Sequence, residues 1–447
     1  MAHAHRSPWL AQLAHDRPHH RLEEDHETDV AVVGAGIAGV STAYFLLKNT
    51  KFKVLLLDAG RIAHGATGHN AGQVVSYFER QLPELAEAYG EEKAVAAQGL
   101  VESAWGLIDD IIRDCGIDAP LHRCQGYSGW STVPQIVRRL RDKQLRKKHG
   151  LLSEPLLVTL DPKVLNEIPD ELMAFALPVP HSVVLGALVT DDMSFLAADV
   201  ESKGCLNSAL FCEQLVASLR ETYGPRLTVV ENLPVTDVIL READADLITT
   251  GPRIIAKRVV LCTNGFENFR IANLAGDDIN PRFHASVQGV IGYMAGYTEP
   301  RPAPAVAISY VRDDRTTDAY HYLTRRPYGA GEASLLCIGG PERPLPASAT
   351  YEADAPFPAA IEEELGQALR GVYRDLDPKA HRDFLWHGLM GYTPTGVRRI
   401  GYEPKNRVLL YNLGCNGVGI LPSVYGGKRI SQLLSGMELP DSLFDPD

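Results

Sequence analysis

Three glycines near the N-terminus have the spacing of a diphosphate-binding turn. Gly34, Gly36 and Gly39 form a G-x-G-x-x-G run between a predicted strand and a predicted helix. The first glycine of such a run permits a tight turn, the second lets the backbone approach a pyrophosphate, and the third allows the helix to pack closely on the strand. The first turn of the helix, at Ile37 and Ala38, would offer free N–H groups and the positive end of its dipole to the phosphates. The alternative is a glycine-rich turn that binds no ligand.

An acidic residue follows at the distance expected for a ribose contact. Asp58 lies 22 residues after Gly36, and Ala59 comes directly after it. A carboxylate at the end of the second strand of a β-α-β unit accepts hydrogen bonds from a ribose. The glycines and Asp58 together predict a dinucleotide site, but they do not distinguish FAD from NAD.

The surrounding elements indicate how this site is built. Residues 28–33 and 53–57 are short apolar runs typical of buried strands, and residues 37–48 between them fit a helix, which makes a β-α-β unit. Apolar residues at helical spacing predict a long amphipathic helix over 91–114. The other expected elements are a helix at 205–222, strands at 227–230, 235–240, 247–249 and 258–262, a β-rich block over about 283–338, a helix at 359–376, a strand at 408–412 and a helix at 425–434.

Both ends of the chain have the pattern of a nucleotide-binding domain, and the β-rich block lies between them. We therefore expect an α/β plus α+β protein, in which a discontinuous Rossmann-like domain contains an inserted antiparallel-sheet substrate domain. The expected boundaries are 1–28 for an N-terminal arm, 29–80, 195–275 and 385–447 for the nucleotide-binding domain, and 81–194 and 276–384 for the substrate domain.

Composition narrows the function classes. The net charge of −12 opposes binding to phosphate backbones, so nucleic acid is not an expected partner. No stretch has the pattern of a transmembrane helix, and the first residues lack the apolar core of a signal peptide. The seven cysteines are scattered without a C-x-x-C pair, which favours a cytoplasmic location and no metal site. The basic run at 138–148 has two interpretations, a solvated helix face or a surface for an anionic partner or membrane.

A small, polar run follows the ribose acid and narrows the cofactor to FAD. It comprises Gly65, Ala66, Thr67, Gly68, His69, Asn70, Ala71, Gly72 and Gln73. The run resembles the G-A-S-G-x-N-x-G-Q motif of the D-amino-acid oxidase superfamily of FAD-dependent oxidoreductases, with Thr67 in place of the serine. The resemblance implies that this run lies along the pyrophosphate and the flavin ring, and that the nucleotide-binding domain holds FAD.

Two later segments carry the same resemblance at the adenosine end. Residues 231–238 resemble the family strand whose valine, here Val235, touches the adenine. Residues 259–265 resemble a strand end near the adenosine, and this implies contacts from Thr263, Asn264 and Gly265.

The C-terminal part of the chain resembles the family's closing pair of motifs. Residues 392–401 and 412–421 match them, and the match implies a helix whose N-terminus faces the flavin pyrimidine ring and stabilises negative charge on the reduced flavin. The residues implied at this helix start are Gly417, Val418, Gly419, Ile420 and Leu421. Within the superfamily, the chain is similar to γ-glutamylputrescine-oxidase-like and sarcosine-dehydrogenase-like amine oxidoreductases, which also carry a tryptophan in an N-terminal arm, as Trp9 does here.

His69 has two interpretations. In dimethylglycine- and sarcosine-dehydrogenase relatives, a histidine in this run is linked covalently to the flavin, and His69 aligns with it. Many other relatives bind FAD without a covalent bond, and His69 would then make an ordinary polar contact with the flavin or a nearby loop. The cysteine-linkage position of monomeric sarcosine oxidases aligns with Gly388, which excludes that linkage.

The resemblance implies oxidation of a C–N bond in a small amine or amino acid. Hydride passes to the flavin, the imine hydrolyses, and the electrons go to dioxygen, a quinone or a carrier. Relatives that act on amino acids hold the substrate carboxylate with a cationic clamp. The matching positions here are Met390, Gly417 and Gly419, so the clamp is missing. Either the substrate has no α-carboxylate, or an arginine on another strand replaces the clamp, the candidates being Arg325, Arg326 and Arg398.

Four further residues are candidates for the reaction itself. Tyr320 and Tyr322 alternate with His321 along a predicted strand, and either set would face the flavin or pack in the sheet. Cys337 stands where a lysine speeds the reaction with oxygen in sarcosine-oxidase-like relatives, which weakens the expectation of an oxidase. We therefore regard Tyr320, Tyr322, Arg325 and Cys337, beside His69, as candidate catalytic residues. The alternative functions are a flavin-bearing electron-transfer subunit of a larger complex, and an FAD enzyme that acts on a non-amine substrate such as a hydroxy acid.

Overall fold

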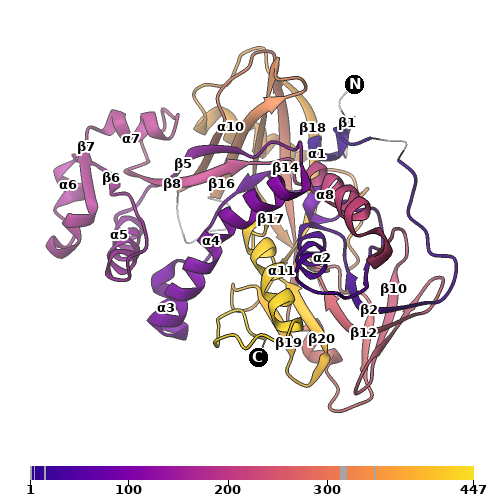
Figure 1. The fold of residues 1–447 in the computed structure, drawn as a ribbon. Coiled ribbons are helices and arrows are strands. Elements are labelled where there is room, and N and C mark those ends of the chain that lie inside the picture. Colours follow the sequence, from indigo (N-terminus) through magenta and orange to yellow (C-terminus); the bar gives the residue numbers. More distant parts are fainter. Residues whose placement is uncertain (1–2, 5, 15–16, 313–319, 347–348, 447) are drawn as a thin grey trace.

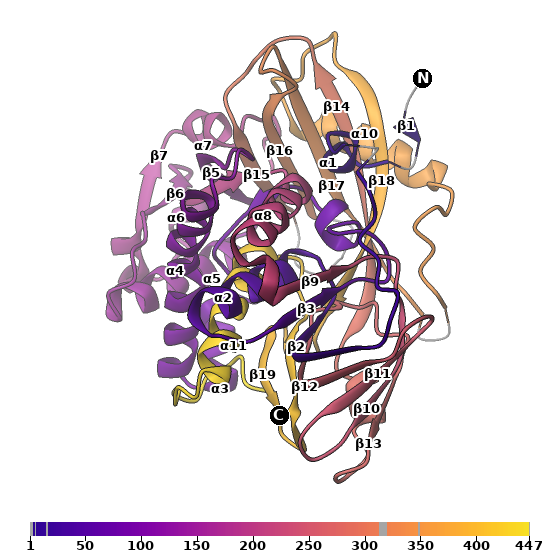
Figure 2. The ribbon, with the colours of Figure 1, turned by 45° about the vertical axis from the view of Figure 1, so that its right-hand side comes forward.

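Two β-sheets and the helices packed on them make up the computed structural model, which describes residues 3–4, 6–14, 17–312, 320–346 and 349–446. Figure 1 shows the smaller sheet, with β2, β10 and β12, below the larger one, with β14, β16 and β17. Figure 2 shows the same arrangement after a turn, with strands of both sheets approaching one another in the middle of the molecule.

The smaller sheet is built on the predicted β-α-β unit. It starts with β2 (His26–Val33), α2 (Ile37–Asn49) and β3 (Val54–Leu57). The strands β2 and β3 pair in parallel, and every residue of β3 is buried. Parallel strands with both faces covered are continuous apolar runs, which is why the sequence V-L-L-L forms this strand.

One strand of the smaller sheet joins distant parts of the chain. On one edge β12 (Ile254–Leu261) pairs in parallel with β2. Its other edge is shared, because β11 (Ala245–Thr249) pairs with its first half and β20 (Asn406–Leu413) with its second half. The remaining strands of this sheet are β9 (Leu227–Val230), β10 (Val235–Leu240), β13 (Arg270–Asn273) and β19 (Arg399–Glu403).

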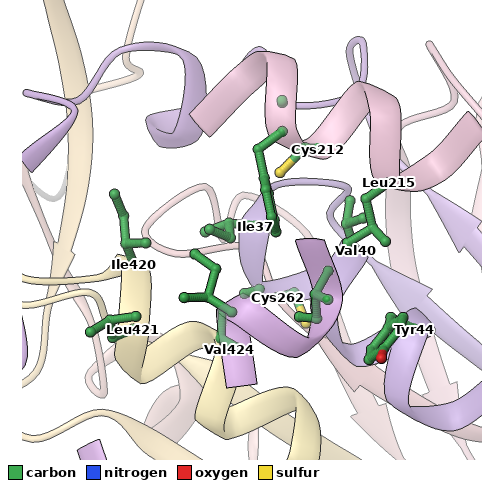
Figure 3. Packing of buried hydrophobic residues seen from close by; sticks show 14 of the residues in the cluster. Ile37, Val40, Tyr44, Cys212, Leu215, Cys262, Ile420, Leu421 and Val424 are labelled. Atoms are coloured by element: carbon green, nitrogen blue, oxygen red, sulfur yellow. The ribbon is translucent and has the colours of Figure 1, made fainter. Parts of the chain in front are cut away.

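Four helices that are separate in sequence share one apolar cluster beside the smaller sheet. They are α2, α8 (Ser208–Tyr223) and α11 (Ile420–Leu434), together with α4 (Glu91–Cys115). In Figure 3 side chains of α2, α8 and α11 meet in one cluster, with Ile37, Cys212 and Val424 among them. The helices α2 and α11 approach closely, since a Cβ on Gly427 would lie 2.8 Å from the backbone of Ser41.

The larger sheet contains both parallel and antiparallel strand pairs. In the described part of the chain its strands are β1 (His3–Ala4), β18 (His381–Tyr392), β14 (Gln288–Glu299), β17 (Ala333–Pro344), β16 (Tyr320–Tyr328), β15 (Val306–Val311), β5 (His122–Trp130), β8 (Ala197–Cys205), β6 (Leu156–Thr159), β7 (Ala176–Val179) and β4 (Gln73–Val74). Helix α10 (Ala359–Val372) covers one face with Ile361, Leu365 and Leu369, which are spaced at helical intervals.

Helices α3 (Leu82–Tyr89), α5 (Val133–Lys148), α6 (Pro162–Leu165) and α7 (His181–Ala187) lie on the left side of Figure 1. Two further short helices are α1 (Pro8–Ala11) and α9 (Asn280–His284). Single 3₁₀ turns occur at Ala66–Gly68, Asp170–Phe175 and Gly224–Arg226. Within the described residues, no helix combines the length and the apolar character needed to cross a membrane.

The basic run at 138–148 forms α5, but neither predicted interpretation describes it fully. Lys143 is buried and its Nζ lies 2.6 Å from Asp199 Oδ1. Arg139 pairs with the same carboxylate, and Arg146 pairs with Glu102. Much of the positive charge therefore points into the protein and is neutralised there, instead of forming only a solvated face.

The two-sheet architecture confirms the predicted fold class. The predicted helix at 205–222 begins three residues later, because Cys205 ends β8 and the Asn207 side chain caps α8 by accepting a hydrogen bond from Leu210 N at 3.0 Å. Strand β8 pairs in the larger sheet although it falls in the segment 195–275 expected for the nucleotide-binding domain. The domain boundaries stay a prediction.

Candidate active site

A cavity of about 580 Å³ lies at the carboxyl ends of β2, β3 and β12 and extends to β14, β16 and β18 of the larger sheet. Open α/β sheets bind their ligands at this end of the strands. The predicted cofactor residues that line it are Gly34, Gly36, Ile37, Ala38, Asp58, Ala59, Gly65, Ala66, Thr67, His69, Asn70, Ala71, Gln73, Val235, Thr263, Asn264, Gly417, Val418, Gly419 and Ile420. Segments from the start, middle and end of the chain thus meet around one space.

Five predicted cofactor residues do not line the cavity, namely Gly39, Gly68, Gly72, Gly265 and Leu421. Two of the glycines instead allow close packing behind its wall. A Cβ on Gly39 would lie 1.8 Å from the carbonyl oxygen of Gly34, and a Cβ on Gly72 would lie 2.7 Å from the Trp9 ring. These glycines shape the wall that the lining residues belong to.

Asp58, which we expect to contact a ribose, is already engaged with the glycine turn. Asp58 Oδ2 accepts a hydrogen bond from Ala35 N at 2.6 Å, and Oδ1 accepts one from Gly60 N at 2.8 Å. Burial raises the pKa of Asp58, while these two bonds favour its charged form. The N–H of Ile37 donates to Thr67 Oγ1 at 2.9 Å, so this first-turn N–H, which we expected to be free for phosphate, is taken by the polar run.

The N-terminal arm holds the polar run in place. Trp9 is 1% exposed and donates from its indole Nε1 to the carbonyl oxygen of Asn70 at 2.6 Å. The Ser7 hydroxyl donates to the carbonyl oxygen of Gly68. Within the run, the Asn70 side chain accepts from Gly72 N at 2.7 Å. The arm and the run therefore form one unit at the edge of the cavity.

His69 makes a polar contact within its own loop. Its Nδ1 lies 2.9 Å from the carbonyl oxygen of Gly65. A carbonyl only accepts, so the proton stands on Nδ1 and the lone pair on Nε2. Burial lowers the pKa of His69, which favours this neutral form. A Cβ on Gly388 would lie 2.8 Å from His69, so the backbone of β18 passes too close for a side chain there.

One side-chain amide links the loop that follows β12 to the loop that precedes α11. Asn264 Oδ1 accepts a hydrogen bond from Cys415 N at 2.7 Å. Glu267, which the sequence did not single out, accepts from Thr263 Oγ1 at 3.0 Å and from Gly265 N at 2.7 Å. Burial raises the pKa of Glu267 to about 7. These bonds fix the relative positions of two loops that are far apart in sequence.

The N-terminus of α11 opens on the cavity. Gly417 to Ile420 line it, and Gly419, the N-cap, offers no side chain to the first-turn N–H groups. Gly417 has φ +74, a left-handed conformation that glycine adopts without strain. The free N–H groups and the helix dipole give this corner a positive potential.

Arg398 provides a buried positive charge to the same cavity. Its Nε and Nη2 donate to the side-chain and backbone oxygens of Asn412 at 2.6 and 2.7 Å. Its Nη1 is buried without a hydrogen-bond partner among the described residues, and burial lowers its pKa to about 10. An orphaned cationic donor in the wall fits an anionic dinucleotide. The glycine cradle, the α2 and α11 N-termini and Arg398 therefore suit FAD, which Asp58, Arg398 and the two helix ends would hold.

The candidate tyrosines share one face of β16. Tyr320 and Tyr322 both line the cavity, with ring centroids 5.5 Å apart, whereas His321 is 9% exposed and does not. Alternation along a strand places residues two apart on the same face. The strand thus presents the tyrosines, and not the histidine, to the expected cofactor.

The other candidates lie outside the cavity lining. Arg325 donates to the carbonyl oxygen of Pro304 at 3.1 Å and stacks 5.8 Å from the Tyr373 ring. Arg326 lies 4.8 Å from the Trp9 ring. Cys337 is 1% exposed in the core, and burial raises its pKa to about 12, so it is a neutral thiol. Arg325 and Arg326 are thus held away from the cavity, and Arg398 remains as its lining arginine.

Several lining residues were missed by the sequence analysis. They are Tyr77, Glu79, Met294, Glu342 and Tyr392. Tyr392 Oη donates to the Glu342 carboxylate at 3.2 Å. One signal was available for Glu342, since it ends an otherwise apolar run in β17. An ionisable group at the end of such a run needs an explanation.

The comparisons with known proteins agree with this geometry. The family model described as "FAD dependent oxidoreductase" matches residues 29–433. A Haemophilus influenzae protein named "Probable oxidoreductase OrdL" is 25% identical over 250 residues, which is 55% of this chain and 51% of that protein. The gamma-glutamylputrescine oxidoreductase of Escherichia coli strain K12 is 33% identical over 115 residues, 26% of this chain and 27% of that enzyme. The chain thus spans about half, or less, of these relatives.

Solved structures share the whole architecture. Glycine oxidase from Geobacillus kaustophilus superimposes with a TM-score of 0.66 at 18% identity, covering 94% of this chain and 98% of that one. L-Proline dehydrogenase from P. horikoshii superimposes with a TM-score of 0.66 at 16% identity, covering 95% and 97%. At these identities the likeness establishes the fold. With the family match over most of its length, the chain belongs to the D-amino-acid oxidase family of FAD-dependent oxidoreductases.

Proposed function

We propose that the protein oxidises a C–N bond of a small amine. The observation that carries this proposal is the continuity of one cavity from Gly34 and Asp58 to Met294 and Tyr322 on the larger sheet. A dinucleotide cofactor and a small substrate would share this space, with the substrate enclosed by side chains of β14, β16 and β18. The names of the relatives support amine or amino-acid chemistry.

The lining favours an amine over an α-amino acid. The three positions that carry the cationic clamp in amino-acid-specific relatives are Met390, Gly417 and Gly419, all uncharged. Arg398 lines the cavity, but two of its nitrogens are committed to Asn412. A substrate carboxylate would therefore lack the paired, bidentate partner that binds it well.

The residues of this chain act by binding and positioning. FAD, when bound, accepts the hydride from the carbon next to nitrogen. The α11 N-terminus stabilises negative charge at its end of the cavity, and Asp58 binds a ribose hydroxyl. The rings of Tyr320 and Tyr322 form an apolar wall that orients the C–H bond and limits water. The electron acceptor is dioxygen, with a quinone or carrier as the alternative, and the rates of reoxidation by each distinguish them.

An anaerobic reduction screen tests this function. Purified protein with bound FAD is mixed without oxygen with amines, amino acids and hydroxy acids, and flavin absorbance is followed. We expect at least one amine to bleach the flavin and to yield an aldehyde or ketone with ammonia or a primary amine. The proposal would be refuted if only hydroxy acids bleached the flavin, or if no compound in the screen did.

Two finer points belong to the same proposal. Seven unpaired cysteines suit a reducing compartment, and we propose a cytoplasmic location, which fractionation of cells tests.

The Nδ1 bond of His69 favours an ordinary polar contact over a covalent flavin link. Acid precipitation then releases the yellow flavin into the supernatant, whereas colour that stays in the pellet and is lost in His69→Ala establishes the covalent link.

A further inference from the structure

A second cavity meets the first at four side chains. It has a volume of about 1100 Å³ and lies against α4, α5 and β8. Tyr77, Glu79, Tyr320 and Glu342 line both cavities, and we call these four residues the neck. A molecule too long for the first cavity therefore has a continuation for its far end, and it would pass the neck.

The neck contains two carboxylates that have no counter-ion within the described part of the chain. Among the described residues, no hydrogen bond or ion pair reaches Glu79, whose side chain is accessible from the two cavities although protein surrounds its carboxyl group. Glu342 accepts a hydrogen bond from Tyr392 Oη. Burial, and for Glu79 the neighbouring charge of Glu342, raises the pKa of each carboxyl to about 7. A cation placed between them would remove this electrostatic cost.

The cations beside the neck are committed elsewhere. Lys203 is fully buried, and its Nζ lies 3.3 Å from Glu201 and 3.1 Å from Ser309 Oγ. Arg80 donates from Nη1 to the carbonyl oxygen of Thr395 at 2.9 Å. Neither lowers the raised pKa values of Glu79 and Glu342. The carboxylates are thus available to a positive group that comes from outside the chain.

Glu79, and the Tyr392 hydroxyl that donates to Glu342, also stand next to the loop expected to hold the flavin. A Cβ on Gly417 would lie 3.2 Å from Glu79 Oε2 and 2.9 Å from Tyr392 Oη. Gly417 occupies a position where amino-acid-specific relatives carry a cation. At this place the chain therefore presents negative charge where those relatives present positive charge.

We propose that the substrate is an elongated amine with a second cationic group, such as a linear diamine or polyamine, and that Glu79 and Glu342 bind this second ammonium at the neck. The proposal rests on the proposed function and narrows its substrate class. The reacting amino group lies in the first cavity, and a longer chain continues into the second. The acids are specificity residues and take no part in the hydride transfer.

A matched series of ligands tests the charge requirement. Butylamine and 1,4-diaminobutane differ by one ammonium group, and glycine supplies a carboxylate. Under anaerobic conditions, the concentration dependence of flavin reduction gives the Kd of each. We expect 1,4-diaminobutane to bind about tenfold or more tightly than butylamine, because a charged hydrogen-bonded pair is being gained.

Charge-neutral variants locate the effect. Glu79→Gln and Glu342→Gln keep the size of the side chain, and each should weaken 1,4-diaminobutane about tenfold while leaving butylamine within about twofold. Glu332→Gln, at an exposed position between β16 and β17, is the control and should change neither. Retained FAD content and a melting temperature no lower than that of the unaltered protein verify that the variants fold.

The outcomes separate the two proposals. Equal affinity for the monoamine and the diamine, or tightest binding of glycine, overturns the acid-neck proposal and leaves amine oxidation standing. An unchanged diamine preference in both glutamine variants overturns it as well. If the diamine perturbs the flavin spectrum with the expected preference but no amine reduces the flavin, amine oxidation fails while the binding site remains. If no amine perturbs or reduces the flavin, both fail.

Discussion

The indole of Trp9 and the backbone carbonyl of Asn70 are joined by a hydrogen bond of 2.6 Å across 61 residues of chain. This bond ties the N-terminal arm to the polar run that lines the cavity. A Cβ on Gly72 would meet the same ring at 2.7 Å, so the ring also sets the path of the run beneath it. The arm is therefore a structural part of the cavity that we propose to hold the cofactor.

Removal of the Trp9 ring should loosen the polar run. We expect Trp9→Ala to lower the free energy of unfolding by roughly 3–5 kcal/mol and to weaken FAD binding, because a cavity replaces a buried ring. Trp9→Phe keeps most of the volume but loses the N–H bond, and it should cost about 1–2 kcal/mol. Flavin fluorescence titration and thermal unfolding measure both effects. FAD affinity equal to wild type in Trp9→Ala would show that the arm does not position the run.

Two glycines predict opposite responses to the same substitution. Gly39→Ala places a methyl group 1.8 Å from the carbonyl oxygen of Gly34, so it should displace the α2–β2 turn and abolish FAD binding. Gly106 lies at an exposed position in the middle of α4, and a Cβ added there would have no atom within 4 Å. Gly106→Ala should therefore stabilise the protein by roughly 1 kcal/mol. Melting temperatures and bound FAD per chain compare the pair. A Gly39→Ala protein that keeps its flavin would contradict this close approach of helix and turn.

The orphaned nitrogen of Arg398 predicts a role in binding the cofactor. Arg398→Met removes the charge from the cavity wall, and we expect the Kd for FAD to rise about tenfold or more, since charged hydrogen bonds contribute roughly 1.5–3 kcal/mol. Arg325→Met is the matched control, because Arg325 is also buried but lines neither cavity. We expect the two variants to lose equal stability, and Arg398→Met alone to lose FAD affinity. Parallel losses in both variants would argue for a structural role alone.

The acid neck predicts how stability changes with pH. Glu79 and Glu342 have folded pKa values of about 7, above the ordinary 4.5, so the folded chain binds more protons than the unfolded chain between these values. Stability then falls as pH rises through this interval, and the loss is complete above about pH 7. Tyr322, Tyr392 and Cys415 also face this group, and burial raises the pKa of both tyrosines, which therefore stay neutral there.

Glu342→Gln tests this sign, because glutamine does not ionise. At about pH 5 its melting temperature should equal that of the unaltered protein, and at about pH 8 it should be higher by a few degrees. Scanning calorimetry at both values provides the measurement. A variant that is less stable at the higher pH would mean that Glu342 is held by a partner and does not carry a raised pKa.

The parts of the site that depend on local backbone geometry were predictable. Gly34, Gly36 and the run at 65–73 impose conformations that short sequence patterns reveal, and the apolar runs of β2 and β3 are equally local. The neck was not predictable in this way. Glu79 and Glu342 are far apart in sequence. Glu342 lies on β17 in the larger sheet, whereas Glu79 lies in the loop between β4 and α3, so only the tertiary fold brings the two to one cavity.

Strand faces explain why some candidates lie outside the cavity. Alternation puts Tyr320 and Tyr322 on one face of β16, but the sequence does not tell which face the cofactor takes. Arg325 stands at the opposite parity and packs toward Tyr373 on the far side. Cys337 shares the cavity-side face, because it pairs with Thr324, yet it is buried where Thr324 donates to the carbonyl oxygen of Ala71. Strand parity therefore accounts for Arg325, whereas packing of Thr324 against Ala71 keeps Cys337 out of the cavity lining.

The shared edge of β12 has a consequence for how the chain matures. Two of its neighbours, β2 and β11, are synthesised before β12 itself. The third, β20, leaves the ribosome only near the end of translation. Until then half of one edge of β12 has no strand to pair with, and the nascent chain exposes it. Native pairing must wait for this late arrival, which makes assembly slow and sensitive to truncation. A chain that stops before β20 should accumulate as a chaperone-bound or aggregated species, even if its N-terminal half has already folded.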